Sequence, residues 1–285
     1  NLCILLSAFE FLRDNSLLIL SLFLILSLGI SHGALDHIKG KKLLKLLNYK
    51  STSTFYILYV LVALSVILLW FLFSKILLLI FLIVASYHFG KEDSEFINSK
   101  SNLELVYFFK GSLVITAPLL FHKTETLNIF NNLNFDISQS LFISNEFLYA
   151  FIAISLFANI IISLNKQIDI KSLLLMDFIS ILLLNYFLNP ILAFTIYFCF
   201  LHSIRHSFKL SNELNKKNFI KGFKEFLIKA MPLTILTAIL FLISLFFLNN
   251  YYFLDNAISK VIFIGLASLT FPHILLEYFL EKNEK

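Results

Sequence analysis

Long apolar runs separated by short polar segments dominate the chain. Each run is close to the roughly 20 residues that a helix needs to cross about 30 Å of hydrocarbon. Hydropathy therefore predicts about eight to ten membrane-spanning helices, with nine as the best estimate, at residues 17–38, 54–73, 75–90, 104–121, 146–164, 171–188, 190–208, 230–249 and 261–280. The first dozen residues are apolar but contain Glu10, and they are predicted to be either an interfacial segment or the remnant of a tenth span.

Two pairs of predicted spans follow one another closely. Lys75 separates the second span from the third, and Asn189 and Pro190 separate the sixth from the seventh, so both joints are predicted to be tight helical hairpins. The sequence contains no internal repeat and no low-complexity linker. Residues 1–285 are therefore predicted to form a single integral membrane domain, an all-α polytopic transmembrane helical bundle.

Composition and charge agree with a place in the lipid bilayer. The chain is 59% hydrophobic and only 14% charged, which excludes an ordinary soluble domain. Its net charge of +5 comes from lysines in the short segments between apolar runs, so a nucleic acid is not an expected partner. Lysine is concentrated at 39–50 and 209–229, which predicts that these segments face the cytoplasm from the plasma membrane. Cys3 and Cys199 are too isolated to indicate a disulfide or thiolate site.

The histidines are the candidate functional residues. Six of the seven lie in or at the ends of predicted spans: His32, His37, His88, His202, His206 and His273. On the predicted topology all six lie toward the cytoplasmic ends of their helices and so share one membrane depth. Polar residues at membrane depth are rare unless they pair, face a cavity or bind a ligand. We therefore expect a metal site toward the cytoplasmic side, with His122 as an interfacial residue outside it.

The spacing of the histidines adds expectations about geometry. His202 and His206 are one turn apart on an α-helix and are predicted to share a face. His32 and Asp36 are spaced in the same way, which would give one helix a ligand and a carboxylate that orients it. Gly90 is a predicted C-cap after His88. Pro272 predicts a kink beside His273, and Glu277 one turn later is predicted to orient that histidine.

Imidazole nitrogen suits iron, zinc, copper or nickel. A ligating histidine usually donates its second ring proton to a carboxylate or carbonyl, so supporting roles are predicted for Asp36, Asp93, Glu277 and the mid-span Asp177. His37 and His273 are each predicted to be either a ligand or a support for one. Arg205 is predicted to reach toward the lipid headgroups or to assist the site.

Four sequence motifs together resemble the Brp/Blh family of membrane beta-carotene 15,15'-dioxygenases. They are His-Gly-Ala-Leu-Asp-His at 32–37, His-Phe-Gly-Lys-Glu-Asp at 88–93, His-Ser-Ile-Arg-His at 202–206 and Pro-His at 272–273. The resemblance implies oxygen-dependent central cleavage of beta-carotene into two retinal molecules, at a non-haem iron(II) held by His32, His88, His202 and His206. It also implies that Asp36, His37, Asp93, Arg205, His273 and Glu277 support the site. A microbial rhodopsin would be the recipient of the retinal.

Two other functions stay open at this level. The same histidines could line a transporter of metal ions or protons, although such a path predicts polar residues in both leaflets. Another membrane metallo-oxygenase is the second alternative. A two-iron desaturase would need repeated His-x-x-His-His motifs, which the chain lacks.

Overall fold

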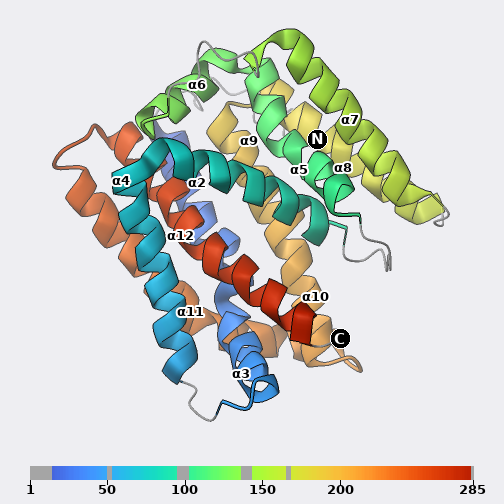
Figure 1. Cartoon of the computed structure of the whole chain (residues 1–285), viewed down its shortest axis with the longest axis vertical. Coiled ribbons are helices and arrows are strands. Elements are labelled where there is room, and N and C mark those ends of the chain that lie inside the picture. The colour runs from blue at the N-terminus through green and yellow to red at the C-terminus, as the bar shows by residue number, and fades with distance from the viewer. Residues whose placement is uncertain (1–14, 50–52, 95–102, 136–142, 165–167, 284–285) are drawn as a thin grey trace. The chain divides into compact units, whose positions relative to one another are not determined.

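The computed structural model describes residues 15–49, 53–94, 103–135, 143–164 and 168–283 (Figure 1). Within these ranges the chain forms helices and turns and no strand, which confirms the all-α prediction. Eight of the described helical segments are long and apolar enough to cross a membrane. The predicted interfacial segment at the N-terminus lies outside the described residues.

The helices follow one another along the chain with few long connections. In order they are α2 (Asn15–Leu24), the π-helix η2 (Ile25–Gly29), the 3-10 helix η3 (Ile30–Leu35), α3 (Asp36–Leu46), α4 (Ser53–Glu92), α5 (Glu104–Phe121), α6 (Lys123–Asn132), α7 (Asn145–Ser163), α8 (Ile168–Phe187), α9 (Pro190–Ile196), the π-helix η5 (Tyr197–Ser203), α10 (Ile204–Leu214), α11 (Phe219–Leu248) and α12 (Leu254–Asn283).

The count of eight candidate spans differs from the predicted nine because the second and third predicted spans form one element. Helix α4 has 40 residues, and its helical path is interrupted at Phe73, where φ is −139° and ψ is 46°. A straight helix of that length would measure about 60 Å, twice the hydrocarbon thickness. The helix therefore breaks at Phe73, two residues before Lys75, which confirms the predicted break between the second and third spans. Two further differences are α6, which forms in a segment predicted as a loop, and the start of α11 at Phe219 instead of residue 230.

The predicted break between α8 and α9 is confirmed. The side chain of Asn189 accepts a hydrogen bond from the backbone N–H of Leu192 at 2.9 Å, which caps the first turn of α9. Pro190 occupies the next position, where its fixed φ suits a helix start and its missing N–H costs nothing. An N-cap residue followed by proline therefore marks the start of a helix in the sequence alone.

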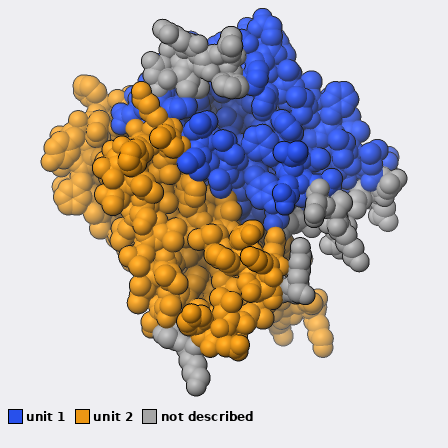
Figure 2. Space-filling model, in the orientation of Figure 1, with its two compact units in different colours: residues 1–21, 78–202 blue, residues 22–77, 203–285 orange. Residues whose placement is uncertain are grey.

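The chain divides into two compact units, shown in Figure 2: residues 1–21 with 78–202, and residues 22–77 with 203–285. In the first unit α5 packs against both α7 and α8. Ile162 of α7 and Leu174 of α8 form a small buried cluster with Val106 and Tyr107 of α5 partly covering it. The first unit therefore contains a three-helix core beside the end of α4.

Helices α4 and α5 approach each other very closely at two glycines of the first unit. A Cβ at Gly90 would lie 1.8 Å from the carbonyl oxygen of Tyr107, and a Cβ at Gly111 would lie 1.9 Å from that of Ser86. Neither distance leaves room for any side chain, so glycine is required on both helices. Gly90 is therefore a packing residue inside α4, which continues to Glu92, and the prediction that it caps the helix is wrong.

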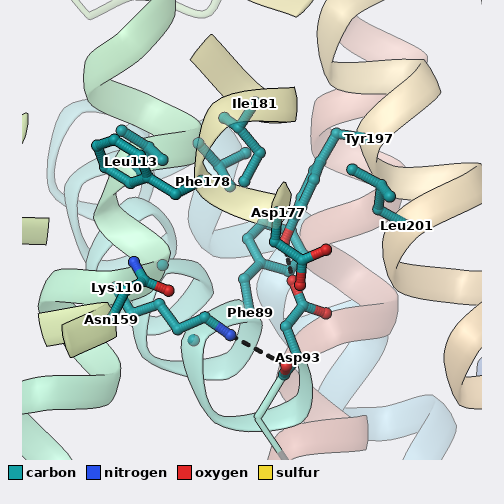
Figure 3. A pocket seen from close by; sticks show the side chains of 13 residues that line it. Phe89, Asp93, Lys110, Leu113, Asn159, Asp177, Phe178, Ile181, Tyr197 and Leu201 are labelled. Carbon is teal, nitrogen blue, oxygen red and sulfur yellow. Dashed lines mark hydrogen bonds between the residues drawn. The ribbon is translucent and has the colours of Figure 1, made fainter. Parts of the chain in front are cut away.

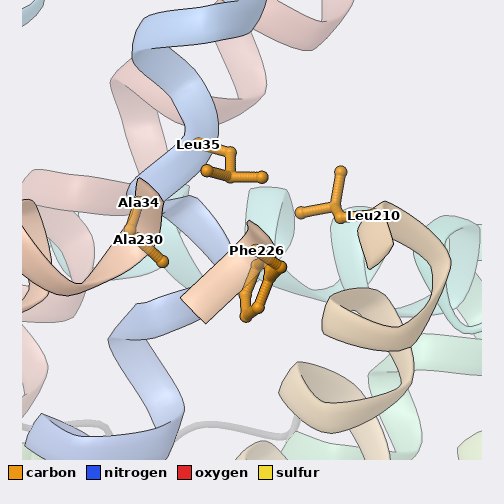
Figure 4. Close-up of a cluster of buried hydrophobic side chains, with 5 residues drawn as sticks. All are labelled: Ala34, Leu35, Leu210, Phe226 and Ala230. Atoms are coloured by element: carbon orange, nitrogen blue, oxygen red, sulfur yellow. The ribbon is translucent and has the colours of Figure 1, made fainter. Parts of the chain in front are cut away.

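In the second unit α11 packs against α10 and η3, and α12 packs against α3. Buried side chains of three segments meet around Phe226 of α11, as Figure 4 shows: Ala34, Leu35, Leu210, Phe226 and Ala230. Phe226 is only 2% exposed. This cluster packs η3, the segment that contains His32, against α10, the helix that contains His206.

The helices depart from regular α geometry at two of the histidine motifs. His32 lies in the 3-10 helix η3, directly after the π-helix η2, and His202 lies in the π-helix η5. The one-turn spacing predicted for His202 and His206 assumed a continuous α-helix, whereas only His206 lies in α10. Short π-helical turns inside longer helices are frequent at functional sites. Sequence spacing alone does not reveal them.

Candidate metal centre

Two buried histidines and a glutamate come together in the first unit. His88 and Glu92 lie one turn apart near the end of α4, and His202 lies near the end of η5. The rings of His88 and His202 have centroids 5.3 Å apart. Oε2 of Glu92 lies 3.6 Å from Nε2 of His88 and 3.5 Å from Nε2 of His202. These three side chains form one of two groups in the described residues whose ligand atoms lie close enough to share a metal ion.

Asp93, the residue after α4, fixes the orientation of His202. Its Oδ1 lies 2.9 Å from Nδ1 of His202, and its Oδ2 accepts a hydrogen bond from the hydroxyl of Tyr197 at 2.7 Å. A carboxylate at Nδ1 holds the imidazole with Nε2 available for a metal, which is the usual arrangement around ligating histidines. The predicted supporting role of Asp93 therefore agrees with the geometry.

Aromatic side chains pack around the same imidazole. The ring of Phe198 stacks on His202 with centroids 5.7 Å apart and an interplanar angle of 18°, and Phe89 meets it edge-on at 4.9 Å. His202 is 1% exposed. A close apolar shell of this kind excludes water from the histidine and limits its rotation.

A small pocket of the first unit lies beside Asp93 (Figure 3). Its polar lining comes from α5, α7 and α8 as Lys110, Asn159 and Asp177. The ammonium of Lys110 donates to the backbone carbonyl of Asp93 at 3.0 Å and to Oγ of Ser94 at 2.8 Å. Lys110 thus holds the backbone that carries Asp93. Asp177 shares this pocket with Asp93, which is where the structure places the predicted mid-span carboxylate.

A second cluster lies within the second unit. Nδ1 of His273 lies 2.9 Å from both carboxylate oxygens of Asp36, and Oδ2 of Asp36 also accepts a hydrogen bond from the hydroxyl of Tyr59 at 2.8 Å. The rings of His206 and His273 have centroids 6.3 Å apart. Asp36, His273 and Glu277 form the second group of the described residues with closely spaced ligand atoms.

The partners in this second cluster differ from those expected. Asp36 contacts Nδ1 of His273, the position predicted for Glu277, while Glu277 forms an ion pair with Lys39. Helix α12 continues from Leu254 to Asn283 through Pro272.

The two units contain similar arrangements, in which a tyrosine hydroxyl and a histidine Nδ1 share one aspartate.

The remaining predicted residues have more local surroundings. Nδ1 of His37 contacts the backbone carbonyl oxygen of Ala34 at 2.9 Å, and Arg205 is half-buried in α10. His122 pairs with Glu125 at 3.4 Å near the start of α6, outside the histidine clusters. The proposed set of four histidine ligands draws on residues of both units, and as a set it stays a prediction.

Glu92 is the residue that the sequence prediction missed. Its signal is the spacing of four from His88, the spacing that places two side chains on one helix face. The donor chemistry suits iron, because imidazole nitrogen and carboxylate oxygen are both ligands of non-haem iron in oxygenases.

Comparison with known proteins adds evidence of a different kind. The sequence profile described as beta-carotene 15,15'-dioxygenase matches residues 23–281. A curated protein named beta-carotene 15,15'-dioxygenase, from uncultured marine bacterium 66A03, is 28% identical over 266 residues, which cover 90% of this chain and 91% of that protein. No solved structure is significantly similar to the chain.

Proposed function

Because the chain belongs to the beta-carotene 15,15'-dioxygenase family, we propose that it cleaves the central double bond of beta-carotene with molecular oxygen and releases two retinal molecules. Each carbon of the broken bond receives one oxygen atom, so beta-carotene and O₂ together account for every atom of the products. The observation that carries the proposal is the buried pair of imidazoles, His88 and His202, in a unit with candidate membrane spans. The carboxylates of Glu92 and Asp93 lie beside His202.

A non-haem iron(II) is the proposed cofactor, with His32, His88, His202 and His206 as its proposed ligands. Iron bound in this way supplies the activation of oxygen that carbon–carbon cleavage requires. The residues of the first unit support this proposal. Asp93 holds Nδ1 of His202, and Phe89 and Phe198 enclose the imidazole in an apolar shell.

The apolar character of the protein suits the substrate. Beta-carotene is an extended hydrocarbon nearly insoluble in water, so an enzyme within the bilayer can take it directly from lipid. Positioning then decides which double bond reacts, because only the bond held beside the metal is cleaved. We propose that the protein lies in the plasma membrane with the metal site toward the cytoplasm, and that a microbial rhodopsin receives the retinal.

The test is expression in cells that already make beta-carotene, followed by extraction and chromatography of the pigments. Cells with the wild-type protein should lose carotene and gain retinal, with no shorter or longer apocarotenal, since cleavage is central. His202→Ala should leave carotene intact. His122→Ala is the matched control, because His122 lies outside both clusters. This variant should cleave carotene as the wild type does.

Membrane levels of each variant are measured in the same cells by immunoblot. Folded wild-type protein that leaves carotene undiminished would refute the proposed activity. Equal retinal from wild type and His202→Ala would refute the role of this histidine.

A further inference from the structure

We propose that Glu92 is a further metal ligand, beside His88 and His202 in the first unit. The inference rests on the proposed function, since it concerns the iron of that reaction. It goes beyond the set of histidines by adding an anionic ligand from the same helix as His88.

The distances favour a shared ion over a direct hydrogen bond. Oε2 of Glu92 lies 3.6 Å and 3.5 Å from the Nε2 atoms of His88 and His202. A hydrogen bond between nitrogen and oxygen measures about 2.7–3.2 Å, so both separations are too long for one. Ligands about 2.0–2.2 Å from a metal, at angles between octahedral and tetrahedral, lie roughly 3.0–3.5 Å from each other. The observed spacing is close to that of ligands around one ion.

The ring nitrogens involved are the correct ones. Nδ1 of His202 is held by Asp93 at 2.9 Å, a true hydrogen-bond distance, so Nε2 is the nitrogen left to bind a metal. The same Nε2 is the atom nearest Glu92. The two carboxylates beside His202 therefore have different roles, with Asp93 orienting the ring and Glu92 meeting its opposite nitrogen.

Burial and charge point the same way. The side chain of Glu92 is 7% exposed, like that of His88, in an element predicted to lie in the membrane. A carboxylate in such surroundings is costly unless a positive charge compensates it. A divalent cation bound between Glu92 and the two imidazoles would contribute such a charge. Imidazole nitrogen and carboxylate oxygen are both ligand types that non-haem iron(II) oxygenases use.

The experiment compares metal binding by purified, metal-free wild type and Glu92→Gln in detergent, with Co²⁺ as the probe. Glutamine preserves the size of the side chain and a hydrogen-bond acceptor but is a poor ligand. Glu92→Gln should bind Co²⁺ at least about tenfold more weakly, with a changed visible absorption spectrum. Glu225→Gln is the control, since Glu225 is half-buried, lies outside both histidine clusters and pairs with Lys229 one turn away, and this variant should bind Co²⁺ as the wild type does. An unchanged affinity and spectrum in Glu92→Gln would overturn the inference.

A second measurement starts from the wild-type protein. Its infrared difference spectra with and without Co²⁺ should show a shift of carboxylate stretching bands, and the conservative variant Glu92→Asp should move those bands. Spectra without any carboxylate shift would overturn the inference. The carotene assay keeps the proposed function separate: a wild type that makes retinal while Glu92→Gln binds Co²⁺ normally refutes only the role of Glu92.

Discussion

Nδ1 of His202 lies 2.9 Å from Oδ1 of Asp93, and this contact joins the two sequence motifs that end α4 and η5. Replacing Asp93 with Ala should reduce metal affinity and retinal formation about 10- to 100-fold, the usual cost of losing a residue that orients a ligating histidine. Metal content of the purified protein and retinal yield measure the effect.

Tyr197→Phe is the graded comparison for that change. It removes one hydrogen bond to the same carboxylate but leaves the contact with His202, so its loss should be much smaller. Equal metal content and activity in Asp93→Ala and wild type would show that the histidine needs no such support.

The corresponding contact in the second unit predicts a loss of stability. Asp36 binds both His273 and the hydroxyl of Tyr59, so Asp36→Ala removes the contacts of a buried histidine and a half-buried tyrosine at once. We expect the free energy of unfolding to fall by about 3 kcal/mol or more. Thermal unfolding in detergent measures this. Tyr59→Phe keeps the contact between Asp36 and His273 and removes the hydroxyl's hydrogen bond to Asp36 and its long one to the carbonyl of Leu269, so it should cost about 1 kcal/mol. A larger loss for Tyr59→Phe than for Asp36→Ala would contradict this account.

The close approach of α4 and α5 predicts a large effect from one added methyl group. Gly111→Ala places a Cβ against the carbonyl of Ser86, so the helices must separate and the yield of folded protein should drop sharply. Gly33→Ala is the matched control for stability, because the nearest atom to its Cβ would be 3.9 Å away. Detergent gel filtration and unfolding midpoints distinguish the two. Similar midpoints for both variants would mean that the helix contact is looser than described.

Lys110 predicts how strongly the end of α4 depends on one buried cation. Lys110→Met removes the hydrogen bonds to the carbonyl of Asp93 and to Ser94, which should cost about 1–3 kcal/mol and lower retinal formation, because the backbone that carries Asp93 is released. Lys229→Met, which removes an ion pair to Glu225 at a half-buried site, should change stability by less than about 0.5 kcal/mol. Retained stability and activity in Lys110→Met would refute the proposed support.

Much of the fold is local information that the sequence displays. The span at 104–121 is the helix α5, and the Asn189–Pro190 pair marks the start of α9, because apolar length and an N-cap act within a few residues. The break predicted beside Lys75 lies at Phe73, because a charged residue marks the division between two apolar runs. The π-helical turns were not predicted, since they leave the apolar runs unbroken.

The site shows the same division. The sequence drew attention to the histidines and to Asp93, which the structure places against His202, because polar residues stand out in apolar runs. Their roles at a metal stay predictions. It could not assign partners, since Asp36 and His273 are far apart in the chain and meet only through the packing of α3 against α12. Glu92 was overlooked although it follows His88 by one turn, because it lies where the apolar run ends and charged residues are common.

The π-helix η2 directly before the His32 motif has a consequence for how relatives should be compared. A π turn is what a helix forms when it accommodates one extra residue while the flanking segments keep their places. The 3-10 helix η3 begins directly after η2, so a widely wound π-helical turn is followed by a tightly wound 3-10 turn. Relatives without the extra residue should therefore align with a one-residue gap within 25–29, before the motif and not inside it. Gap placement, more than percentage identity, would then reveal which relatives share this irregular helix.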